Sequence, residues 1–184
     1  MYGYIKGTIK MIKPTHIVLD NNGIGYLIIV PNPYIYKLEE ENIIYIHHYV
    51  REDINNLYGF VSEEAKELFI RLISVSGIGP KSGLSIMATD NIDTVIYAIE
   101  NSDVKFLTKF PGIGNKTAQQ IILDLKGKLV IEEQIVRFGA MEDAENALLA
   151  LGYSKREINK VLKNIDFNLS VEEIIKEALK KILN

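Results

Sequence analysis

The chain of 184 residues has no cysteine and no long apolar run. The lack of cysteine excludes disulfides, zinc fingers, iron–sulfur clusters and thiol nucleophiles. Residues 26–30 form an apolar run of five, and no run is longer, whereas a membrane-spanning helix needs ~20 apolar residues. The first residues also lack a basic stretch followed by an apolar one, so we predict no secretion signal. These absences favour a cytoplasmic protein.

The sequence also lacks an excess of positive charge. It has 21 Lys and Arg against 24 Asp and Glu, a net charge of −3. Acidic residues exceed basic ones in each third, by 6 to 5 in residues 1–62, 10 to 9 in 63–138 and 8 to 7 in 139–184. Nucleic-acid-binding proteins are often strongly basic, so any such binding here must come from local geometry. The content of 47% hydrophobic and 24% charged residues is that of a folded globular protein.

The first third has the pattern of short β-strands. We predict strands at residues 4–12, 15–19, 25–30, 43–50 and 57–61. Five strands in about 60 residues indicate a small Greek-key barrel of the OB type. Gly7, inside the first strand, predicts a tight bend. Residues 51–56 form the loop between the last two strands.

From Ser62 onwards the apolar residues follow a helical period. Ser62 is expected to cap a first helix, and further helices are predicted at residues 81–88, 92–100, 104–109 and 115–127. Residues 130–140 lack periodicity and are predicted to be a linker. Three short helices follow at residues 143–151, 155–163 and 171–183, with Ser154 and Ser170 as N-caps.

The predicted fold class is therefore α+β. It has four segments: a barrel at residues 1–62, a helical domain at 63–129, the linker at 130–140 and a three-helix domain at 141–184.

An internal repeat is the most informative motif. Its first copy is Gly77-Ile78-Gly79-Pro80-Lys81-Ser82, and 35 positions later comes Gly112-Ile113-Gly114-Asn115-Lys116-Thr117. Each copy is predicted to be a helix, a Gly-Ile-Gly turn and a second helix. Two copies in the same helical setting are far more specific than a single Gly-x-Gly.

The chemistry of the repeat favours phosphate binding. Glycines allow the backbone to approach a ligand closely, and the following helix offers unpaired N–H groups and a positive dipole end to an anion. Lys81 and Lys116 add a positive charge beside the bound phosphate. A dinucleotide-binding site is excluded because helices, not strands, precede the glycines. A P-loop is excluded because its pattern occurs nowhere in the chain.

The repeated turn resembles the helix-hairpin-helix motif, and the order of barrel, tandem hairpins and helical tail resembles the RuvA family of Holliday-junction-binding proteins. Three further stretches carry this resemblance: Val50-Arg51-Glu52-Asp53, Leu57-Tyr58-Gly59-Phe60 and Leu151-Gly152-Tyr153. It covers essentially the whole chain. Two positions depart from the family, which often has basic residues where this chain has Asn115 and Gln120. That departure should weaken phosphate binding and its dependence on salt.

The resemblance implies a structure-specific, sequence-independent binder of four-way junction DNA, with an OB-fold barrel, a tandem helix-hairpin-helix domain and a UBA-like tail. Such a protein is the non-catalytic scaffold of an AAA+ ATPase motor, RuvB, which drives branch migration in recombination and DNA repair. The resemblance also implies a homotetramer, or an octamer of two tetramers on DNA, and a junction-resolving nuclease, RuvC, as a further partner. No cofactor and no metal are expected.

The resemblance also assigns residues to these roles. Glu52 and Asp53 would form an acidic pin at the junction centre. The DNA-binding residues would be Gly77, Ile78, Gly79, Lys81, Ser82, Gly112, Ile113, Gly114, Lys116, Thr117 and Arg51. For the motor the resemblance implies only that the tail is the contact. The tail of 44 residues is too small to bury a deep core, so we expect partly exposed apolar side chains to bind the motor. The candidates are Leu148, Leu151, Tyr153, Leu179 and Ile182, although Leu148 and Ile182 fit the core of the three-helix domain equally well.

Other functions remain open from the residues alone. A helix-hairpin-helix glycosylase would need a catalytic Lys or Asp after a hairpin, and Asp124 is the only loose candidate. A protein-interaction adaptor would use the tail alone. Glu52 and Asp53 have too few acidic neighbours for a nuclease metal site, and without the resemblance they would be a solvated turn. His47 and His48 are adjacent on a predicted strand, so they point to opposite faces and are unsuited to sharing a metal ion.

Overall fold

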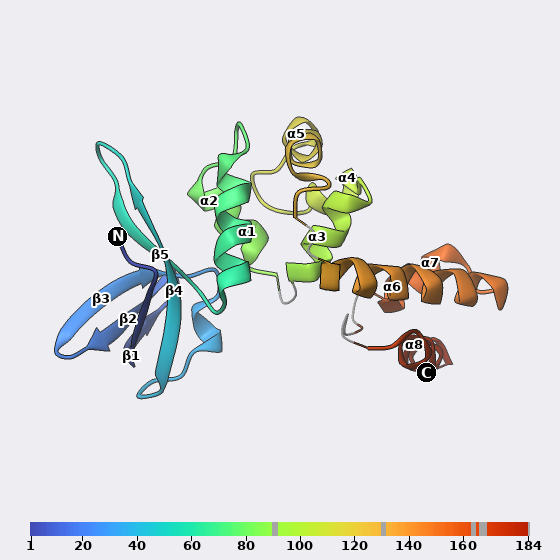
Figure 1. Cartoon of the computed structure of the whole chain (residues 1–184), viewed down its shortest axis with the longest axis horizontal. Helices are drawn as coiled ribbons and strands as arrows, with labels where there is room; N and C mark the ends of the chain where they lie inside the picture. Colours follow the sequence, from blue (N-terminus) through green and yellow to red (C-terminus); the bar gives the residue numbers. More distant parts are fainter. Residues whose placement is uncertain (90–91, 130–131, 163–164, 166–168, 184) are drawn as a thin grey trace. The chain divides into compact units, whose positions relative to one another are not determined.

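A computed structural model describes all residues of the chain except 90–91, 130–131, 163–164, 166–168 and 184. The chain divides into two compact units, Met1–Lys126 and Gly127–Asn184 (Figure 1). Within the described residues, no helix has both the length and the apolar character needed to cross a membrane.

The first unit begins with the predicted five-stranded barrel, which is confirmed. Its strands are β1 Tyr4–Lys13, β2 His16–Asn21, β3 Ile24–Ile29, β4 Glu41–Val50 and β5 Asn55–Phe60. The barrel closes in the order β1-β2-β3-β5-β4. Every strand pairing is antiparallel except that of β3 with β5. A short 3-10 helix, η1 Pro33–Ile35, joins β3 to β4. It was not predicted because three residues are too few to show a period.

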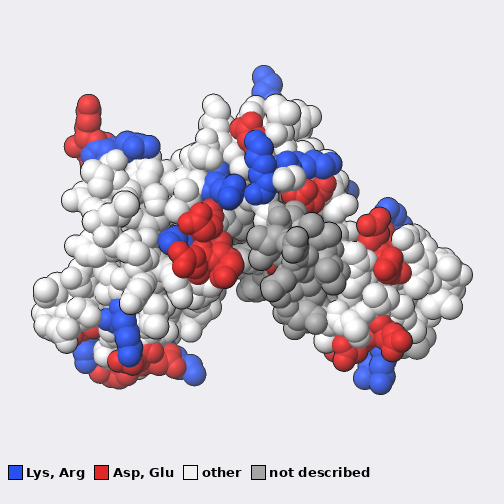
Figure 2. Space-filling view, viewed as in Figure 1, with Lys and Arg blue, Asp and Glu red and all other residues white. Residues whose placement is uncertain are grey.

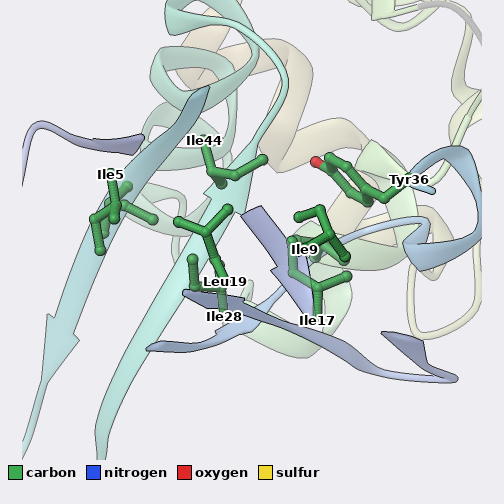
Figure 3. Packing of buried hydrophobic residues seen from close by; sticks show 9 residues of the cluster. Ile5, Ile9, Ile17, Leu19, Ile28, Tyr36 and Ile44 are labelled. Atoms are coloured by element: carbon green, nitrogen blue, oxygen red, sulfur yellow. The ribbon is translucent and has the colours of Figure 1, made fainter. Parts of the chain in front are cut away.

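The barrel core consists of inward-facing residues of β1 to β4, with Leu57 of β5 packed against them. Figure 3 shows six of these core residues: Ile5, Ile9, Ile17, Leu19, Ile28 and Ile44. Tyr36, just after η1, also packs into this core, and its burial raises the pKa of the phenol to about 12.

Gly7 lies where β1 changes partners, as the predicted bend requires. β1 pairs with β4 through residues 4–8 and with β2 through residues 8–13. A Cβ at Gly7 would overlap the carbonyl oxygen of Asp20 on β2. The close approach of the two strands therefore requires glycine here.

The described residues of the first unit also form the helices α1 Glu63–Ser74, α2 Pro80–Met87, α3 Ile92–Glu100, α4 Val104–Leu107 and α5 Asn115–Leu125. Ser62 caps α1 as predicted, because its hydroxyl accepts a hydrogen bond from the Ala65 N–H at 3.2 Å. α1 packs against β4 and β5, which ties the helices to the barrel.

The second unit contains α6 Glu132–Ala150, α7 Lys155–Leu162 and α8 Val171–Leu183. The prediction of a linker at residues 130–140 was wrong for residues 132–140, which form the first part of α6. Glu132, Glu133 and Gln134 are good helix formers, and extending a helix that already exists over the later residues of α6 needs no new nucleus. Residues 130–131, and Lys163 at the predicted end of α7, lie outside the described residues.

The two predicted N-caps of the second unit are confirmed. The Ser154 hydroxyl accepts a hydrogen bond from the Glu157 N–H at 3.3 Å, and the Glu157 carboxylate accepts one from the Ser154 N–H at 2.9 Å. Ser170 and Glu173 repeat this capping box at 3.4 and 3.0 Å. The hydrogen bonds from each serine lower the pKa of the corresponding glutamate.

Candidate nucleic-acid interface

Hairpin one, residues 72–83, turns between α1 and α2. Gly77 adopts a φ of +86°, a conformation that favours glycine. The Ile78 N–H donates to the Val75 carbonyl at 3.1 Å, and the Ile78 side chain is buried. The Gly79 carbonyl accepts the first hydrogen bond of α2 from the Gly83 N–H at 3.0 Å. Ile78 thus anchors the turn in the core while both glycines stay exposed.

Hairpin two, residues 107–118, repeats this arrangement bond for bond between α4 and α5. Gly112 has a φ of +83°. The Ile113 N–H donates to the Phe110 carbonyl at 3.1 Å, and the Gly114 carbonyl accepts from the Ala118 N–H at 2.9 Å. Ile113 is buried as Ile78 is. The sequence repeat is therefore a structural repeat.

The N-termini of α2 and α5 are open. Gly79 and Gly114 are the N-caps, and neither offers a side chain to the first N–H groups of its helix. Their φ angles, −96° and −88°, suit any residue, and a Cβ on either would meet no atom within 4 Å. Packing within the chain therefore does not require glycine at these positions. Glycine instead leaves unpaired N–H groups and the positive end of the helix dipole accessible to an anion.

The two hairpins differ in the number of backbone donors. Pro80, the first residue of α2, has no N–H, whereas Asn115 at the same place in α5 has one. Lys81 and Lys116 are exposed at the second positions, and among the described residues neither ammonium forms an ion pair. The Gln120 amide donates to the Asp124 carboxylate at 2.9 Å along α5. Hairpin two thus offers one more N–H, but the Gln120 amide is held by Asp124.

Ser82 and Thr117 are half-buried rather than exposed. The hydroxyl of Ser82 faces Gly112, where a Cβ would stand 3.0 Å from it. Ser82 thus belongs to the contact between the two hairpins. Over the helical part of this unit, Figure 2 shows Lys and Arg side chains interspersed with Asp and Glu.

The predicted acidic pin lies at the tip of the β4–β5 hairpin. The Arg51 N–H donates to the Ile54 carbonyl at 2.8 Å, and the Ile54 N–H donates back to Arg51 at 3.4 Å. Glu52 and Asp53 are therefore the two central residues of a tight turn, and both are exposed. Within the described part of the chain, neither carboxylate forms an ion pair. This hairpin extends beyond the rest of the barrel (Figure 1), and acidic and basic side chains sit together at its tip (Figure 2).

Arg51 rests on an aromatic ring that our sequence reasoning missed. Its guanidinium lies 4.7 Å from the centroid of the Tyr49 ring, an arrangement with cation–π attraction. Residues two apart on a strand share a face, so this spacing in the sequence was the signal for the pair. Tyr49 thereby holds the Arg51 charge beside the acidic turn.

A second missed feature is a column of rings on the same face of the β4–β5 hairpin. The Tyr49 ring meets Tyr58 at 6.1 Å between centroids, and Tyr58 meets Phe69 of α1 at 5.3 Å. His47 also lies on this face, 5.9 Å from Phe69. Burial lowers the pKa of His47, and the charges of His48 and Lys66 lower it further.

His48 lies on the opposite face, as the strand alternation predicts, and its Nε2 is 2.7 Å from the Asn55 side-chain oxygen. Nowhere in the described part of the chain do three His, Asp or Glu side chains cluster so as to hold a metal ion.

The predicted motor-binding residues differ in exposure. Leu151 is 62% exposed, whereas Leu148 is fully buried in the bundle. Leu148 therefore stabilises the tail rather than lining its surface, because its side chain has no free face. Tyr153, Leu179 and Ile182 are half-buried.

Leu149, which was not predicted, is 39% exposed and lies two residues before Leu151 in the sequence. Gly152, with a φ of +92°, ends α6 here. The Tyr153 N–H donates to Leu148 and the Gly152 N–H to Leu149, at 3.2 and 3.0 Å, which is a Schellman cap.

Comparison with known proteins gives three consecutive family matches. The RuvA N terminal domain matches residues 1–59, the SAM-like helix-hairpin-helix tandem matches residues 69–127, and the RuvA C-terminal domain matches residues 139–183. This order agrees with the predicted order of barrel, tandem hairpins and helical tail.

Full-length relatives agree with the domain matches. Three of them carry the name Holliday junction branch migration complex subunit RuvA. The one from Acholeplasma laidlawii is 55% identical over 185 residues, covering 100% of both chains. The one from Bacillus cytotoxicus is 46% identical over 202 residues, covering 100% of this chain and 98% of the relative. The one from Lactococcus lactis subsp. cremoris is 47% identical over 196 residues, covering 100% of both.

Proposed function

The chain belongs to the RuvA family, and from this premise we propose that it binds four-way (Holliday) junction DNA as the scaffold of a branch-migration motor. Its binding is structure-specific and independent of sequence. The observation that carries the proposal is the pair of open helix N-termini, at Gly79 and Gly114, in a chain that matches its relatives from end to end. Because its substrate would be DNA, we place its action in the cytoplasm, in recombination and DNA repair.

Each hairpin is proposed to bind phosphates of a duplex arm from the minor-groove side. The first N–H groups of α2 and α5 have no side-chain cap, and the glycine that precedes each helix is exposed with open space around it, so a phosphate oxygen can approach. Lys81 and Lys116 add an exposed positive charge at each site. Such contacts reach the sugar–phosphate backbone but no base edge, so they carry no sequence information.

The acidic turn is proposed to provide selectivity for junctions. Glu52 and Asp53 place two negative charges at an exposed hairpin tip. Continuous duplex laid over this tip would bring phosphates close to carboxylates, which repel each other. At a junction the strands separate and can pass around the tip. Repulsion of the wrong substrate thus gives specificity, while Arg51 holds a phosphate at the rim.

The proposed assembly is a homotetramer with four-fold symmetry, or two tetramers around one junction. Four acidic turns would then converge near the symmetry axis. A junction-resolving nuclease of the RuvC type is a proposed further partner, acting on the same DNA.

The second unit is proposed to bind the AAA+ motor RuvB, which supplies the ATP hydrolysis, so this chain itself would not be an enzyme. The candidate contacts are the exposed Leu151 with Leu149, and the half-buried Tyr153, Leu179 and Ile182. This role is tested by removing the second unit. The chain is shortened at the unit boundary, after Lys126, and not at the end of the predicted linker, because a cut at residue 140 would fall inside α6. A chain ending at Lys126 should bind junctions as the full chain does, yet fail to stimulate the motor. Full stimulation by the shortened chain would refute this role.

The DNA-binding proposal is tested by mobility shift of four-way junction, duplex and single strand at matched salt. The wild-type chain should prefer the junction. Gly114→Val should abolish most binding, because the branched side chain blocks the phosphate while φ and space permit the fold. Gly139→Ala, at another position where a Cβ meets nothing within 4 Å, is the control and should bind normally. Wild-type binding by a folded Gly114→Val chain would exclude the hairpins as the site.

The two alternatives predict other results. A glycosylase would excise a damaged base from duplex DNA, but its one candidate residue, Asp124, accepts a hydrogen bond from Gln120 on its own helix. An adaptor would show no DNA binding once the tail is removed. The chain ending at Lys126 therefore also separates the scaffold from the adaptor.

A further inference from the structure

Phe69 of α1 packs directly on the strands that carry the acidic turn. Its side chain is fully buried. Its ring centroid lies 4.8 Å from that of Phe60, 5.3 Å from Tyr58 and 5.9 Å from His47. Tyr58 and His47 face each other across the β4–β5 ladder, whose far end is the turn with Glu52 and Asp53. Phe69 therefore lies at the base of this hairpin.

The Phe69 ring also packs on α2, the helix that begins at hairpin one. The position of a Cβ at Gly83 lies 3.0 Å from the Phe69 Cε2 atom and 2.9 Å from Ile73. Gly83 is buried and is the donor of the first hydrogen bond of α2, to Gly79. One ring thus touches both the strands of the acidic turn and the helix that opens at the phosphate-binding glycine.

The internal repeat supplies a comparison within the same chain. Thirty-five positions after Phe69 stands Val104, and thirty-five after Gly83 stands Ala118. The glycines and isoleucines of the turn are kept in both copies. Phe69 and Gly83 occur only in the first copy of the repeat, whose helix α1 packs against β4 and β5. These two residues therefore belong to the placement of hairpin one against the barrel and not to the hairpin motif itself.

We propose that Phe69 is a positioning residue that fixes hairpin one relative to the acidic turn, and that junction specificity depends on it although it touches no DNA. Phosphate binding requires only an intact hairpin. Rejection of continuous duplex requires more, because the carboxylates must stand at a set place beside the phosphates that the hairpin holds. This inference rests on the proposed function.

The test measures the ratio of the duplex Kd to the junction Kd for full-length Phe69→Leu and Phe69→Ala. This ratio is insensitive to a loss of folded protein, because unfolding weakens binding to both substrates alike. We expect it to fall by about threefold or more in Phe69→Ala, a coupling typical of residues in contact, and by less in Phe69→Leu, which keeps an apolar side chain. Ile17→Ala, in the barrel core away from α1, is the control for lost stability and should keep the wild-type ratio.

The same substitutions are then made in a chain that also carries Glu52→Gln and Asp53→Asn. If Phe69 acts by placing the acidic turn, Phe69→Leu and Phe69→Ala will leave the ratio unchanged in that background. A ratio that falls equally in both backgrounds, or that stays at the wild-type value in both Phe69 variants, would overturn the inference. A wild-type chain without junction preference would instead refute the proposed function itself.

Discussion

The hydroxyl of Ser82 in α2 lies against the backbone of Gly112, so that a Cβ at position 112 would stand 3.0 Å from the hydroxyl oxygen. Gly77, at the same place in hairpin one, has no atom within 4 Å of its Cβ position. Both glycines have a φ near +85°, at +86° and +83°. The two turns therefore share a backbone conformation but differ in what surrounds them, and Ser82 joins one hairpin to the other.

This difference predicts unequal costs for the same substitution. Gly77→Ala should lower the free energy of unfolding by about 1–2 kcal/mol, the cost of a positive φ for an L-residue. Gly112→Ala should lower it further, because its Cβ also meets Ser82. Urea unfolding measures both values. In a chain that also carries Ser82→Gly, the loss of unfolding free energy caused by Gly112→Ala should be close to the loss that Gly77→Ala causes in the wild-type chain. If the two glycine variants cost the same in the wild-type chain, the contact with Ser82 does not contribute to stability.

The lysines of the hairpins should control the salt dependence of binding. Lys81→Ala and Lys116→Ala should each weaken binding to all duplex arms alike, and each should lower the slope of log K against log salt by about 0.9, the value for one lost phosphate contact. Titration over a range of salt concentrations measures the slope. Lys13→Ala, an exposed lysine at the end of β1, should leave it unchanged. An unchanged slope for both hairpin variants would place the phosphates elsewhere.

The sequence predicted most of the fold because each element carries its own local pattern. The strands alternate, the helices begin at capping serines such as Ser154 and Ser170, and the repeated turn shows its glycines directly. The start of α6 was missed because residues 132–140 have helix propensity without an apolar period. Propensity alone is a weak signal next to burial.

The candidate site was predicted only where the motif itself carries the chemistry. Gly79 and Gly114 follow from the repeat. Phe69 does not, because on its own helix it resembles any other apolar core residue. Its role depends on the strands β4 and β5, which only the fold brings next to it. The one signal in the sequence was that the second copy of the repeat has Val104 where the first has Phe69. For Leu148 the sequence left a motor contact and a place in the core open, because composition does not distinguish a buried leucine from an exposed one; the structure places this side chain in the core.

The tail leucines should separate stability from partner binding. Leu148→Ala should destabilise the second unit by about 2–5 kcal/mol, as expected for a fully buried leucine. Leu151→Ala should change stability little, because this side chain is 62% exposed, yet it should reduce stimulation of the motor ATPase. Thermal unfolding and ATPase assays measure the two effects. If Leu151→Ala stimulates the motor fully, the exposed end of α6 is not the contact.

His47 should make stability depend on pH. Burial lowers the pKa of this imidazole, aided by His48 and Lys66 and opposed by Glu67, while Phe69 and Tyr49 face it. The folded chain then binds fewer protons than the unfolded chain, whose histidine has its usual pKa of 6.5. This contribution to the free energy of unfolding is complete above that pKa and is lost as the pH falls through it.

Urea unfolding at about pH 7.5 and about pH 5.5 measures this dependence, since the two values bracket the ordinary histidine pKa. His47→Gln should show a smaller loss of stability at the lower pH than the wild-type chain. Asn56→Gln, on β5 of the same hairpin, replaces no titratable group; it is the control and should lose as much as wild type does. Equal losses for all three chains would assign the dependence to other groups.

Removing the negative charges of the acidic turn should strengthen binding to duplex DNA. Glu52→Gln with Asp53→Asn removes two exposed charges but keeps the size and polarity of both side chains. If these carboxylates repel the phosphates of continuous duplex, duplex binding will strengthen and the preference for the junction will shrink. Mobility shifts on junction and duplex at one salt concentration measure both quantities.

The matched control is Glu142→Gln with Asp143→Asn, because this second Glu-Asp pair is exposed on α6, in the other unit. Both double variants change the net charge equally, so long-range attraction to DNA rises by a similar amount in each. Only a charge at the place where continuous duplex would bind affects duplex and junction differently. The turn should therefore change the ratio of the two Kd values, and the α6 pair should change both Kd values together. If the two double variants behave alike, the turn at Glu52 and Asp53 is an ordinary solvated loop, and junction specificity must come from the geometry of the hairpins.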